Sequence, residues 1–373
     1  MPEYDWTSST ASEGSITVEM ISQNDLTQSY GPLKNIDLAA SSLDATWDSD
    51  TKTSGSLTVY GDEWVRGSFL RIAYEIPSWE YKRYLGTYVV TADPSDYNKK
   101  VWSTRMTLHS AGLYTLSTHN AERPLTLSKN ASARTAIRQI LTNAYRPFVD
   151  QSTVDYTFSS ASVLETGTTL LERVLSIAGT VFDINVNGEG YVTISDFVYP
   201  VNRSSAFDLT LKSLKSVALD NLQRTSNFLS IPGRAIVSYR YSETTGSGNS
   251  RKTVEYEITG VADSTGITSP NNRGYVISDF ENLSELEPKT QARANELALQ
   301  KIRSISAEEV TWTITTTYLP IWEGDVITLH ITDGDERYQG THRCLVQDIS
   351  MGLATRQMRL TLTDLSEYSL SEY

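Results

Sequence analysis

Histidine is the side chain that most often binds catalytic metals or moves protons at neutral pH. This chain has four histidines, His109, His119, His330 and His342. No pair of them has the spacing that places two metal ligands on one face of a helix, and there is no Cys/His cluster. His330 and His342 could face each other across a hairpin, but no third ligand lies near them in the sequence. The pattern favours a cross-strand pair over a zinc site.

Carboxylates are numerous, and some of them gather in turns. Asp333, Asp335 and Glu336 resemble a calcium-binding loop, but the longer ligand series and the distal bidentate glutamate are missing. A charged hairpin tip is the better interpretation. A glycosidase could still have its two carboxylates among the 45 acidic residues, because the sequence does not show which of them converge.

Nucleophiles and phosphate-binding loops are also poorly supported. The segment 246–248 is only a broken form of a nucleophile elbow and has no strand–turn–helix setting. The segment 187–190 (NGEG) indicates a hairpin turn, because no helix follows it. Cys344, the single cysteine, lies in an apparent strand and is predicted to be buried and inert. We therefore predict no catalytic residue, no metal ligand and no cofactor, and expect a protein that is not an enzyme.

Composition limits the remaining possibilities. The chain has 373 residues, which predicts two to four domains, and a single cysteine rules out an internal disulfide and fits folding in a reducing cytosol. Its formal net charge is −13, and Lys34 and Lys52 are the only basic residues before residue 61. Such an acidic surface repels phosphate, which argues against tight nucleic-acid binding but not against DNA passing by. We expect no membrane span, because no run of about twenty apolar residues occurs.

The first part of the chain has the period-two pattern of half-buried strands. Roughly seven strands are expected, at 15–20, 43–47, 57–60, 69–76, 85–91, 101–108 and 112–116. Turn signals separate them by 8–12 residues, which is typical of an antiparallel barrel or sandwich. We predict an N-terminal β-barrel domain over residues 1–120.

The middle of the chain changes to helical periodicity. A helix is predicted over 133–144, capped by Asn130 or Ser132, and a second over 169–178. Thr169 and Glu172 have capping-box spacing, and Gly179 allows a left-handed exit. A hairpin turning at 187–190 follows. We predict a small helix–helix–hairpin domain over residues 121–205.

The last part returns to strands. They are expected at 234–241, 253–258, 309–318, 326–331, 341–349 and 359–363, with a helix that begins near Pro288. The helix is expected to turn Ala294, Leu297, Ala298 and Ile302 inward, and a Pro/Gly corner is expected at 320–325. We predict a second β-barrel domain with loop insertions over residues 206–373. The fold class is therefore mainly β with an α+β insert, and residues 209–273 are the hardest to assign.

This order of elements resembles a known family. The segments that carry the resemblance are 67–74 (GSFLRIAY), 84–91 (YLGTYVVT), 170–175 (LLERVL) before the 187–190 hairpin, the helix over 292–303, the corner 320–327 (PIWEGDVI) and the last strand 357–362 (QMRLTL). Together they resemble the tail-tip hub proteins of long-tailed bacteriophages, often described as minor tail proteins. That family is similar in fold to the baseplate hub of contractile-tailed phages and to the spike base of type VI secretion.

The resemblance implies a structural role in the virion. A hub subunit with two similar barrels would form a homotrimer, so that six barrels match a sixfold tail tube on one side and threefold fibres or a spike on the other. It implies a location at the tail tip, assembly in the host cytoplasm, and contacts with the distal tail protein or tail tube, the tape measure protein and the tip fibres. Genomic DNA would pass through the channel without specific binding.

Aromatic residues beside turn signals are candidates for subunit contacts. Trp64 and Trp322 are the two that we select, because large rings next to turns can hardly all belong to the core. Two other functions stay open from the sequence. The chain could be a carbohydrate- or receptor-binding module of a tail tip, because Tyr/Trp-rich β proteins often stack sugars on their rings, or a cell-wall hydrolase.

Overall fold

The computed structural model divides the chain into two compact units. Unit 1 contains Met1–Gln223 and Thr313–Leu362, and unit 2 contains Arg224–Trp312 and Thr363–Tyr373. The structure describes residues 6, 13–47, 49–61, 64–98, 101–158, 161–164, 166–179, 181–210, 222–226, 231–245, 252–264, 269–283, 290–305, 310–332 and 339–365. These units do not follow the boundaries expected at residues 120 and 205. The division into three domains stays a prediction about which parts fold independently.

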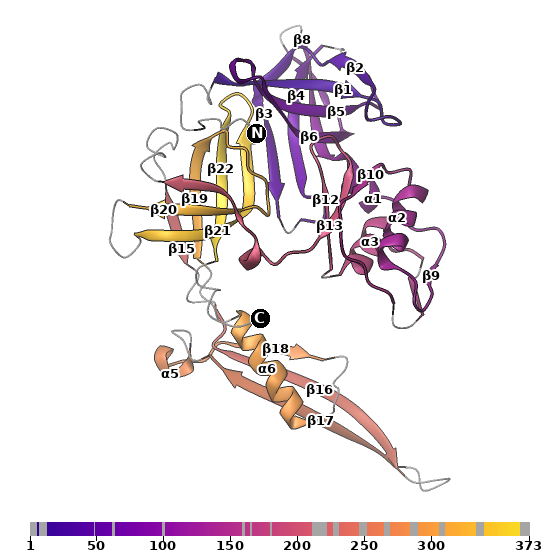
Figure 1. Cartoon of the computed structure of the whole chain (residues 1–373), viewed down its shortest axis with the longest axis vertical. Helices are drawn as coiled ribbons and strands as arrows, with labels where there is room; N and C mark the ends of the chain where they lie inside the picture. Colours follow the sequence, from indigo (N-terminus) through magenta and orange to yellow (C-terminus); the bar gives the residue numbers. More distant parts are fainter. Residues whose placement is uncertain are drawn as a thin grey trace. The chain divides into compact units, whose positions relative to one another are not determined.

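The first β lobe of unit 1 contains six of the seven predicted strands, together with two short strands, β2 and β7, that were not predicted (Figure 1). Its elements are β1 (Ser15–Ile21), β2 (Ser29–Pro32), β3 (Ile36–Thr46), β4 (Thr53–Tyr60), β5 (Phe69–Ile76), the 3-10 turn η2 (Pro77–Trp79), β6 (Tyr81–Ala92), β7 (Ser95–Asn98) and β8 (Val101–Ser110). They are hydrogen-bonded in the order β3-β4-β8-β6-β5-β1-β2, with β7 beside β8. Strand β5 is buried along nearly its whole length, so the core of the lobe lies around it.

A small helical subdomain follows within unit 1. Its elements are α1 (Ala111–Ser117), β9 (Leu125–Leu127), α2 (Ala133–Asn143), β10 (Phe148–Asp150), β11 (Ser162–Leu164), α3 (Leu170–Ala178), β12 (Phe182–Val186) and β13 (Val192–Asp196). The predicted capping box on α3 is present, with the Glu172 amide 3.1 Å from Thr169 Oγ1 and the Thr169 amide 2.7 Å from Glu172 Oε2. Ser132 caps α2, and Gly179 ends α3 at φ +54°. Both helix predictions are confirmed.

The strand predicted over 112–116 is wrong, because these residues form helix α1. Leu113 and Leu116 lie three residues apart, so a helix turns both into the core shared with α2 and α3. Gly112 also packs closely on the β12–β13 hairpin, where a Cβ would lie 2.7 Å from Val186 Cγ2. Five residues are too few to distinguish a helical period from a strand period. Packing against the neighbouring helices therefore determines that this segment is a helix.

The turn between β12 and β13 joins the helical subdomain to the first lobe. Gly188 packs on β6 so tightly that a Cβ would lie 2.3 Å from the Tyr84 carbonyl oxygen. The Thr87 hydroxyl donates to the Gly188 carbonyl over 2.9 Å. The buried Arg71 guanidinium donates to the carbonyls of Glu189 and Leu26 over 2.7 and 2.9 Å. The glycine-rich segment 187–190 is therefore a hairpin turn, as predicted, and also an attachment point.

A second β lobe lies largely in unit 1, although most of β15 and one end each of β19 and β22 belong to unit 2. After the 3-10 turn η3 (Pro200–Asn202), its strands are β14 (Ser205–Thr210), β15 (Gln223–Ser226), β19 (Val310–Thr317), β20 (Val326–Ile331), β21 (Gly340–Gly352) and β22 (Gln357–Asp364). They follow the order β14-β20-β21-β22-β19-β15. Strand β14 runs parallel to β20, which the expectation of wholly antiparallel barrels did not include. Among the described residues, the hydrogen-bonded order of each lobe is an open run rather than a closed barrel.

The two lobes share one strand order. Taken in chain order, six strands of the first lobe are β1, β3, β4, β5, β6 and β8, and six of the second are β14, β15, β19, β20, β21 and β22. In both lobes the first strand pairs with the fourth. From the fourth strand the sheet continues through the fifth, sixth, third and second strands, in that order. The predicted similarity of the two β units therefore extends to their strand order, although the first and fourth strands are antiparallel in the first lobe and parallel in the second.

Unit 2 is a three-stranded sheet with one helix on one face. Its elements are β16 (Arg234–Thr245), β17 (Lys252–Asp263), α5 (Pro270–Arg273), β18 (Ser278–Asn282) and α6 (Gln291–Ile305), with the strand order β17-β16-β18. Helix α6 lies against Gly260, where a Cβ would be 2.0 Å from the Ala294 carbonyl oxygen. Ala298 and Ile302 of α6 are buried, as predicted. The expected helix start at Pro288 lies outside the described residues.

Candidate functional site: the seam between the two β lobes

Strands β3 and β21 join the two lobes into one continuous sheet. Their antiparallel ladder runs from Asp348 opposite Thr46 to Gly352 opposite Ser42. The Trp47 amide extends it by donating to the Gln347 carbonyl over 2.8 Å. This ladder is the seam, and it fixes the two lobes relative to each other inside unit 1.

The predicted corner at 320–325 closes one end of the seam. Gly324 adopts φ +81°, and its amide donates to the Val346 carbonyl over 2.8 Å. The Trp322 amide donates to the Asp325 carboxylate over 2.7 Å. The Trp47 ring packs against Gly324, so close that a Cβ there would be 2.1 Å from the ring. Only glycine allows both this backbone conformation and this approach.

Cations surround the Trp47 ring. The Arg203 guanidinium lies 4.5 Å from its centroid, and the Lys52 ammonium lies 4.7 Å away. Arg203 Nη1 also donates to the Gly324 carbonyl over 2.6 Å. Arg203 thus bridges the ring of one lobe and the corner of the other, which favours a rigid seam.

The two predicted interface residues lie in corresponding turns but are not brought together. Trp322 is half-buried, and the Arg83 guanidinium of β6 covers its ring at 4.2 Å from the centroid. Trp64 is half-buried in the turn before β5, and its buried Nε1 has no acceptor among the described residues. Part of each ring therefore already packs within the chain, and a subunit contact by the remainder stays a prediction.

An aromatic cluster lies beside the corner. The Tyr74 and Tyr318 rings stack at a centroid distance of 3.9 Å, and Trp6 meets Trp79 and Tyr81 edge-on at 5.3 and 4.9 Å. Burial raises the pKa of both Tyr74 and Tyr318. The sequence signal for this cluster was Trp6, a large ring in an otherwise polar segment.

The corner also holds a buried acid. The Glu323 side chain is 5% exposed, and its Oε2 has no donor among the described residues. Burial raises the pKa of Glu323 to about 7, and it also raises the pKa of Asp325. The adjoining cavity, lined by Tyr88, Tyr318 and Trp322 among others, has a volume of about 40 Å³. That space suits a single water rather than a sugar, so the raised pKa is no sign of a glycosidase.

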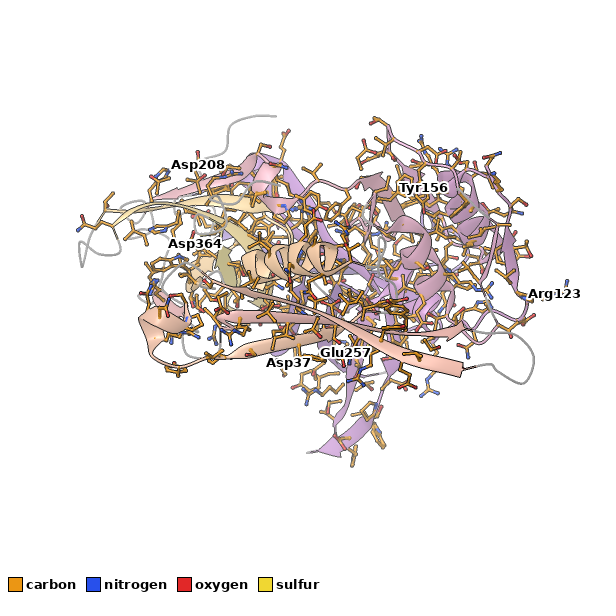
Figure 2. All side chains as sticks on the ribbon, turned by 90° about the horizontal axis from the view of Figure 1, so that it is seen from below. Asp37, Arg123, Tyr156, Asp208, Glu257 and Asp364 are labelled. Atoms are coloured by element: carbon orange, nitrogen blue, oxygen red, sulfur yellow. The ribbon has the colours of Figure 1, made fainter. Side chains whose placement is uncertain are left out.

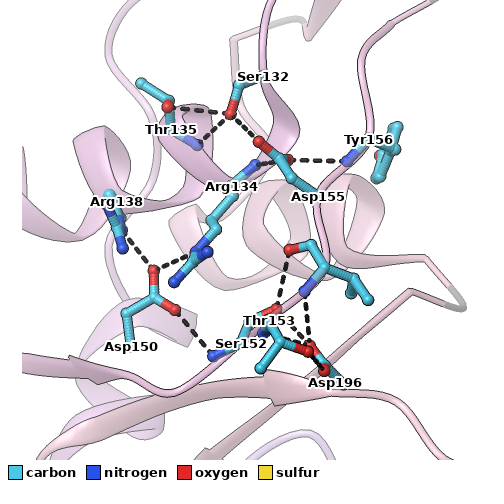
Figure 3. Close-up of polar contacts among 11 residues, drawn as sticks. Ser132, Arg134, Thr135, Arg138, Asp150, Ser152, Thr153, Asp155, Tyr156 and Asp196 are labelled. Carbon is cyan, nitrogen blue, oxygen red and sulfur yellow. Dashed lines mark hydrogen bonds and ion pairs between the residues drawn. The ribbon is translucent and has the colours of Figure 1, made fainter.

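Three other carboxylates have structural partners, as Figure 3 shows. Burial acts to raise the pKa of Asp150, but hydrogen bonds from Arg134 and Arg138 lower it overall. Hydrogen bonds from the hydroxyls of Ser152 and Thr153 lower the pKa of Asp196 to about 2. These acids stay ionised and hold the 151–158 segment, so they are unsuited to donating protons.

Asp155 completes this network at the start of α2. Its carboxylate accepts from the Ser132 hydroxyl over 2.6 Å and from the Arg134 amide over 3.1 Å. The neighbouring Tyr156, labelled in Figure 2, belongs to the same segment and packs edge-on against Phe158 at 5.5 Å.

Several other candidates for chemistry can also be placed. His330 lies opposite Thr341 rather than His342, with its Nδ1 3.0 Å from the Thr341 hydroxyl, so the expected histidine pair is wrong by one residue of register. Cys344 is buried, as predicted. The 333–336 turn lies outside the described residues. Within the described residues, no group of three His, Cys, Asp or Glu could hold a metal, and no helix is long and apolar enough to cross a membrane.

An exposed aromatic pair was missed by sequence reasoning. Tyr97 on β7 and Trp102 on β8 are 60% and 51% exposed, and their rings lie 5.2 Å apart. They are directly opposite each other in the ladder. The signal in the sequence was one ring on each side of a short polar turn, which is typical of a hairpin with a cross-strand aromatic pair.

Comparisons with known proteins identify the fold. No protein-family model matches the chain, and no curated protein matches it in sequence. The tail protein from Neisseria meningitidis MC58 is similar in structure, with a TM-score of 0.61, 10% identity, and coverage of 94% of this chain and 96% of that chain. The 43 kDa tail protein of prophage MuSo2 from Shewanella oneidensis matches with a TM-score of 0.60 at 10% identity. The match covers 94% of this chain and 97% of that chain.

A third similar structure is larger. A chain of the Francisella PdpA-VgrG complex gives a TM-score of 0.52 at 11% identity, and the match covers 96% of this chain but 53% of that chain. At such identities the similarity concerns the fold alone. This chain has the fold of phage tail proteins, which confirms the resemblance to tail hubs at that level.

Proposed function

We propose that this chain is a structural component of a phage tail, and that three copies form a pseudo-sixfold hub at its distal end. The observation that carries the proposal is similarity to two tail proteins over more than nine-tenths of both chains, at TM-scores of 0.61 and 0.60. The match covers 94% of this chain in both cases, so it extends over both β lobes and the helical subdomain. The tail tip of a virion is the proposed location, and the host cytoplasm the proposed place of assembly.

The duplicated strand order supports the proposed symmetry. Each copy contributes two lobes with one strand order, so three copies contribute six such lobes. A ring of this kind can meet a sixfold tube on one side and a threefold fibre or spike on the other. The proposed partners are the tail tube or distal tail protein, the tape measure protein and the tip fibres. Similarity to a chain of the PdpA-VgrG complex supports partners of the tail and spike kind.

Solution mass and electron microscopy test the hub. At tens of micromolar we expect a mass of three times 41.5 kDa, and negative-stain images of a threefold ring with a central hole. A strict monomer at that concentration would contradict the hub. We also expect no retention of double-stranded DNA at physiological salt, since the net charge is −13. Salt-dependent retention by the isolated ring would contradict passive DNA passage.

The carbohydrate-binding alternative has one feature in its favour. The exposed Tyr97–Trp102 pair is wide enough to stack on a sugar ring. A glycan array separates the two functions, because the hub proposal expects no binding by this chain alone. Incubation with peptidoglycan tests the hydrolase alternative in the same way, with released fragments as the readout.

A further inference from the structure

We propose that the outer edge of β7 in one copy pairs with β15 of the next copy, repeating between chains the β3–β21 seam that joins the lobes within one chain. This inference rests on the proposed ring and names its subunit interface. It follows from the shared strand order of the two lobes, because equivalent strands can make equivalent contacts.

The strands of the internal seam have clear counterparts. The seam joins the fifth strand of the second lobe, β21, to the second strand of the first lobe, β3. The remaining fifth strand is β6, and the remaining second strand is β15. A chain that makes this contact once internally therefore has one more strand of each kind to offer to its neighbours.

Strands β6 and β7 together correspond to the long β21. Strand β21 pairs with β20 as far as Leu345 and then continues along β3. Strand β6 pairs with β5 as far as Tyr88. The chain then continues along β8 through Pro94, whose carbonyl accepts from the Arg105 amide over 3.0 Å, into β7. Strand β7 is thus the counterpart of the part of β21 that pairs with β3.

Both counterpart edges are open. Among the described residues, β7 pairs with β8 alone and β15 pairs with β19 alone. An open edge presents a row of backbone donors and acceptors that a second strand can satisfy. The side chains are compatible as well, because β7 carries the exposed Asp96, whereas β15 (QRTS) carries Arg224 and no acid.

The turns before the fourth strands show the same relation. Gly67 precedes β5 at φ +84°, as Gly324 precedes β20 at φ +81°. In the internal seam the Trp47 ring covers Gly324, but a Cβ on Gly67 would meet no described atom within 4 Å. The corner of the first lobe is therefore open where that of the second lobe is covered. Val65 in this turn, and Val101 on β8, are 49% exposed, as expected of an uncovered contact.

This pairing is head-to-tail and can close a ring. Each chain would give one β7 edge and receive on one β15 edge, so the contact is heterologous rather than twofold. Three copies would then have three internal seams and three between chains. The exposed Tyr97–Trp102 pair would lie beside the contact rather than serve a sugar.

Cysteine cross-linking tests the pairing in the full chain. Two exposed residues, Asp96 on β7 and Thr225 on β15, are replaced by cysteine in the double variant Asp96→Cys/Thr225→Cys. This variant is then treated with a short bismaleimide. We expect covalent trimers on a denaturing gel, and dimers when the two single variants are mixed. The control is Ser29→Cys/Thr225→Cys, with its first cysteine on β2, an exposed strand at the end of the sheet, for which we expect no link. The native Cys344 is buried in both.

The outcomes separate this inference from the hub itself. A wild-type trimer without an Asp96–Thr225 link, or with equal linking from β2, would overturn the pairing and leave the hub standing. A wild-type monomer would overturn both. In a second arm, Tyr97→Asp should weaken self-association at least tenfold with an unchanged circular dichroism spectrum, since the side chain is 60% exposed. Unchanged association would also overturn the pairing.

Discussion

Glu323 is the residue whose environment has the clearest consequence for stability. Burial raises its pKa from 4.5 to about 7, so the folded chain holds the proton more tightly than the unfolded chain. Its stabilising contribution is fully present below pH 4.5 and is lost as the pH rises through about 7. We predict that Glu323→Gln, neutral at every pH, removes this loss. Relative to wild type, the variant should gain about 3 kcal/mol in free energy of unfolding between pH 4.5 and 8.5.

Urea unfolding of both proteins at several pH values measures this difference. Comparing the two chains cancels carboxylates such as Asp196, whose lowered pKa gives a dependence of the opposite sign at lower pH. Glu189→Gln, at an exposed position, is the control and should follow the wild type throughout. A difference between Glu323→Gln and wild type that does not change with pH would contradict the buried, protonated acid.

Gly324 is the residue on which the geometry of the seam depends. We predict that Gly324→Ala lowers the free energy of unfolding by about 2–4 kcal/mol, because φ +81° strains alanine and the new Cβ meets the Trp47 ring at 2.1 Å. Gly167 has φ +88° with no described atom near a Cβ, so Gly167→Ala should lose only about 1 kcal/mol. Thermal or urea unfolding of the wild type and both variants measures these losses. Equal losses would mean that the Trp47 contact contributes nothing.

Sequence reasoning at this scale succeeded where the backbone alone decides the outcome. Gly179, Thr169 and Glu172 were predicted from local rules, and their geometry follows those rules. The predicted pairing of His330 with His342 across the hairpin was wrong, because the register of two strands depends on the whole ladder. The Arg83 contact of Trp322 could not be foreseen, since it joins residues 239 positions apart.

Among the elements, the β12–β13 turn carries the sharpest prediction. We expect Gly188→Ala to detach the helical subdomain from the first lobe, because its Cβ would lie 2.3 Å from the Tyr84 carbonyl oxygen. Backbone atoms cannot move aside as a side chain can, so the loss in stability should be about 3 kcal/mol or more. Glu189→Ala in the same turn is the control, since only its backbone carbonyl binds Arg71. Limited proteolysis should cleave the Gly188 variant faster, and equal rates would contradict the docking.

The number of residues over which a hydrophobic period repeats explains which elements could be predicted from the sequence. Helices α2 and α3 are long enough to show their repeat, and they form as predicted. Strand β5 shows no repeat, because both of its faces are buried, and was predicted from its β-branched and aromatic residues. Helix α1 is too short, and the strand prediction failed there. The parallel β14–β20 pair carries no local signal, because its strands lie more than a hundred residues apart. The correspondence between Gly67 and Gly324 also became visible only once both turns were seen to precede a fourth strand.

Over the whole molecule, the place of unit 2 in the chain explains why residues 209–273 were hard to assign. Its first segment begins inside β15, at Arg224, and ends inside β19, at Trp312, and these two strands are neighbours in the sheet. The first lobe joins its equivalent strands, β3 and β4, through residues 47–52 alone. A sequence does not show that a long excursion replaces a short turn, because the strands on either side look the same in both cases.

The final prediction tests whether unit 2 is such an insertion. Residues 227–309 are replaced by a six-residue turn copied from 47–52, which should leave unit 1 folded, since its strands keep their neighbours. We expect a strand-rich circular dichroism spectrum and one cooperative unfolding transition. A second variant has a flexible linker of the same length as residues 227–309 in their place, and it controls for the entropy of closing the loop. Aggregation or non-cooperative unfolding of both variants would mean that unit 1 needs unit 2 in order to fold.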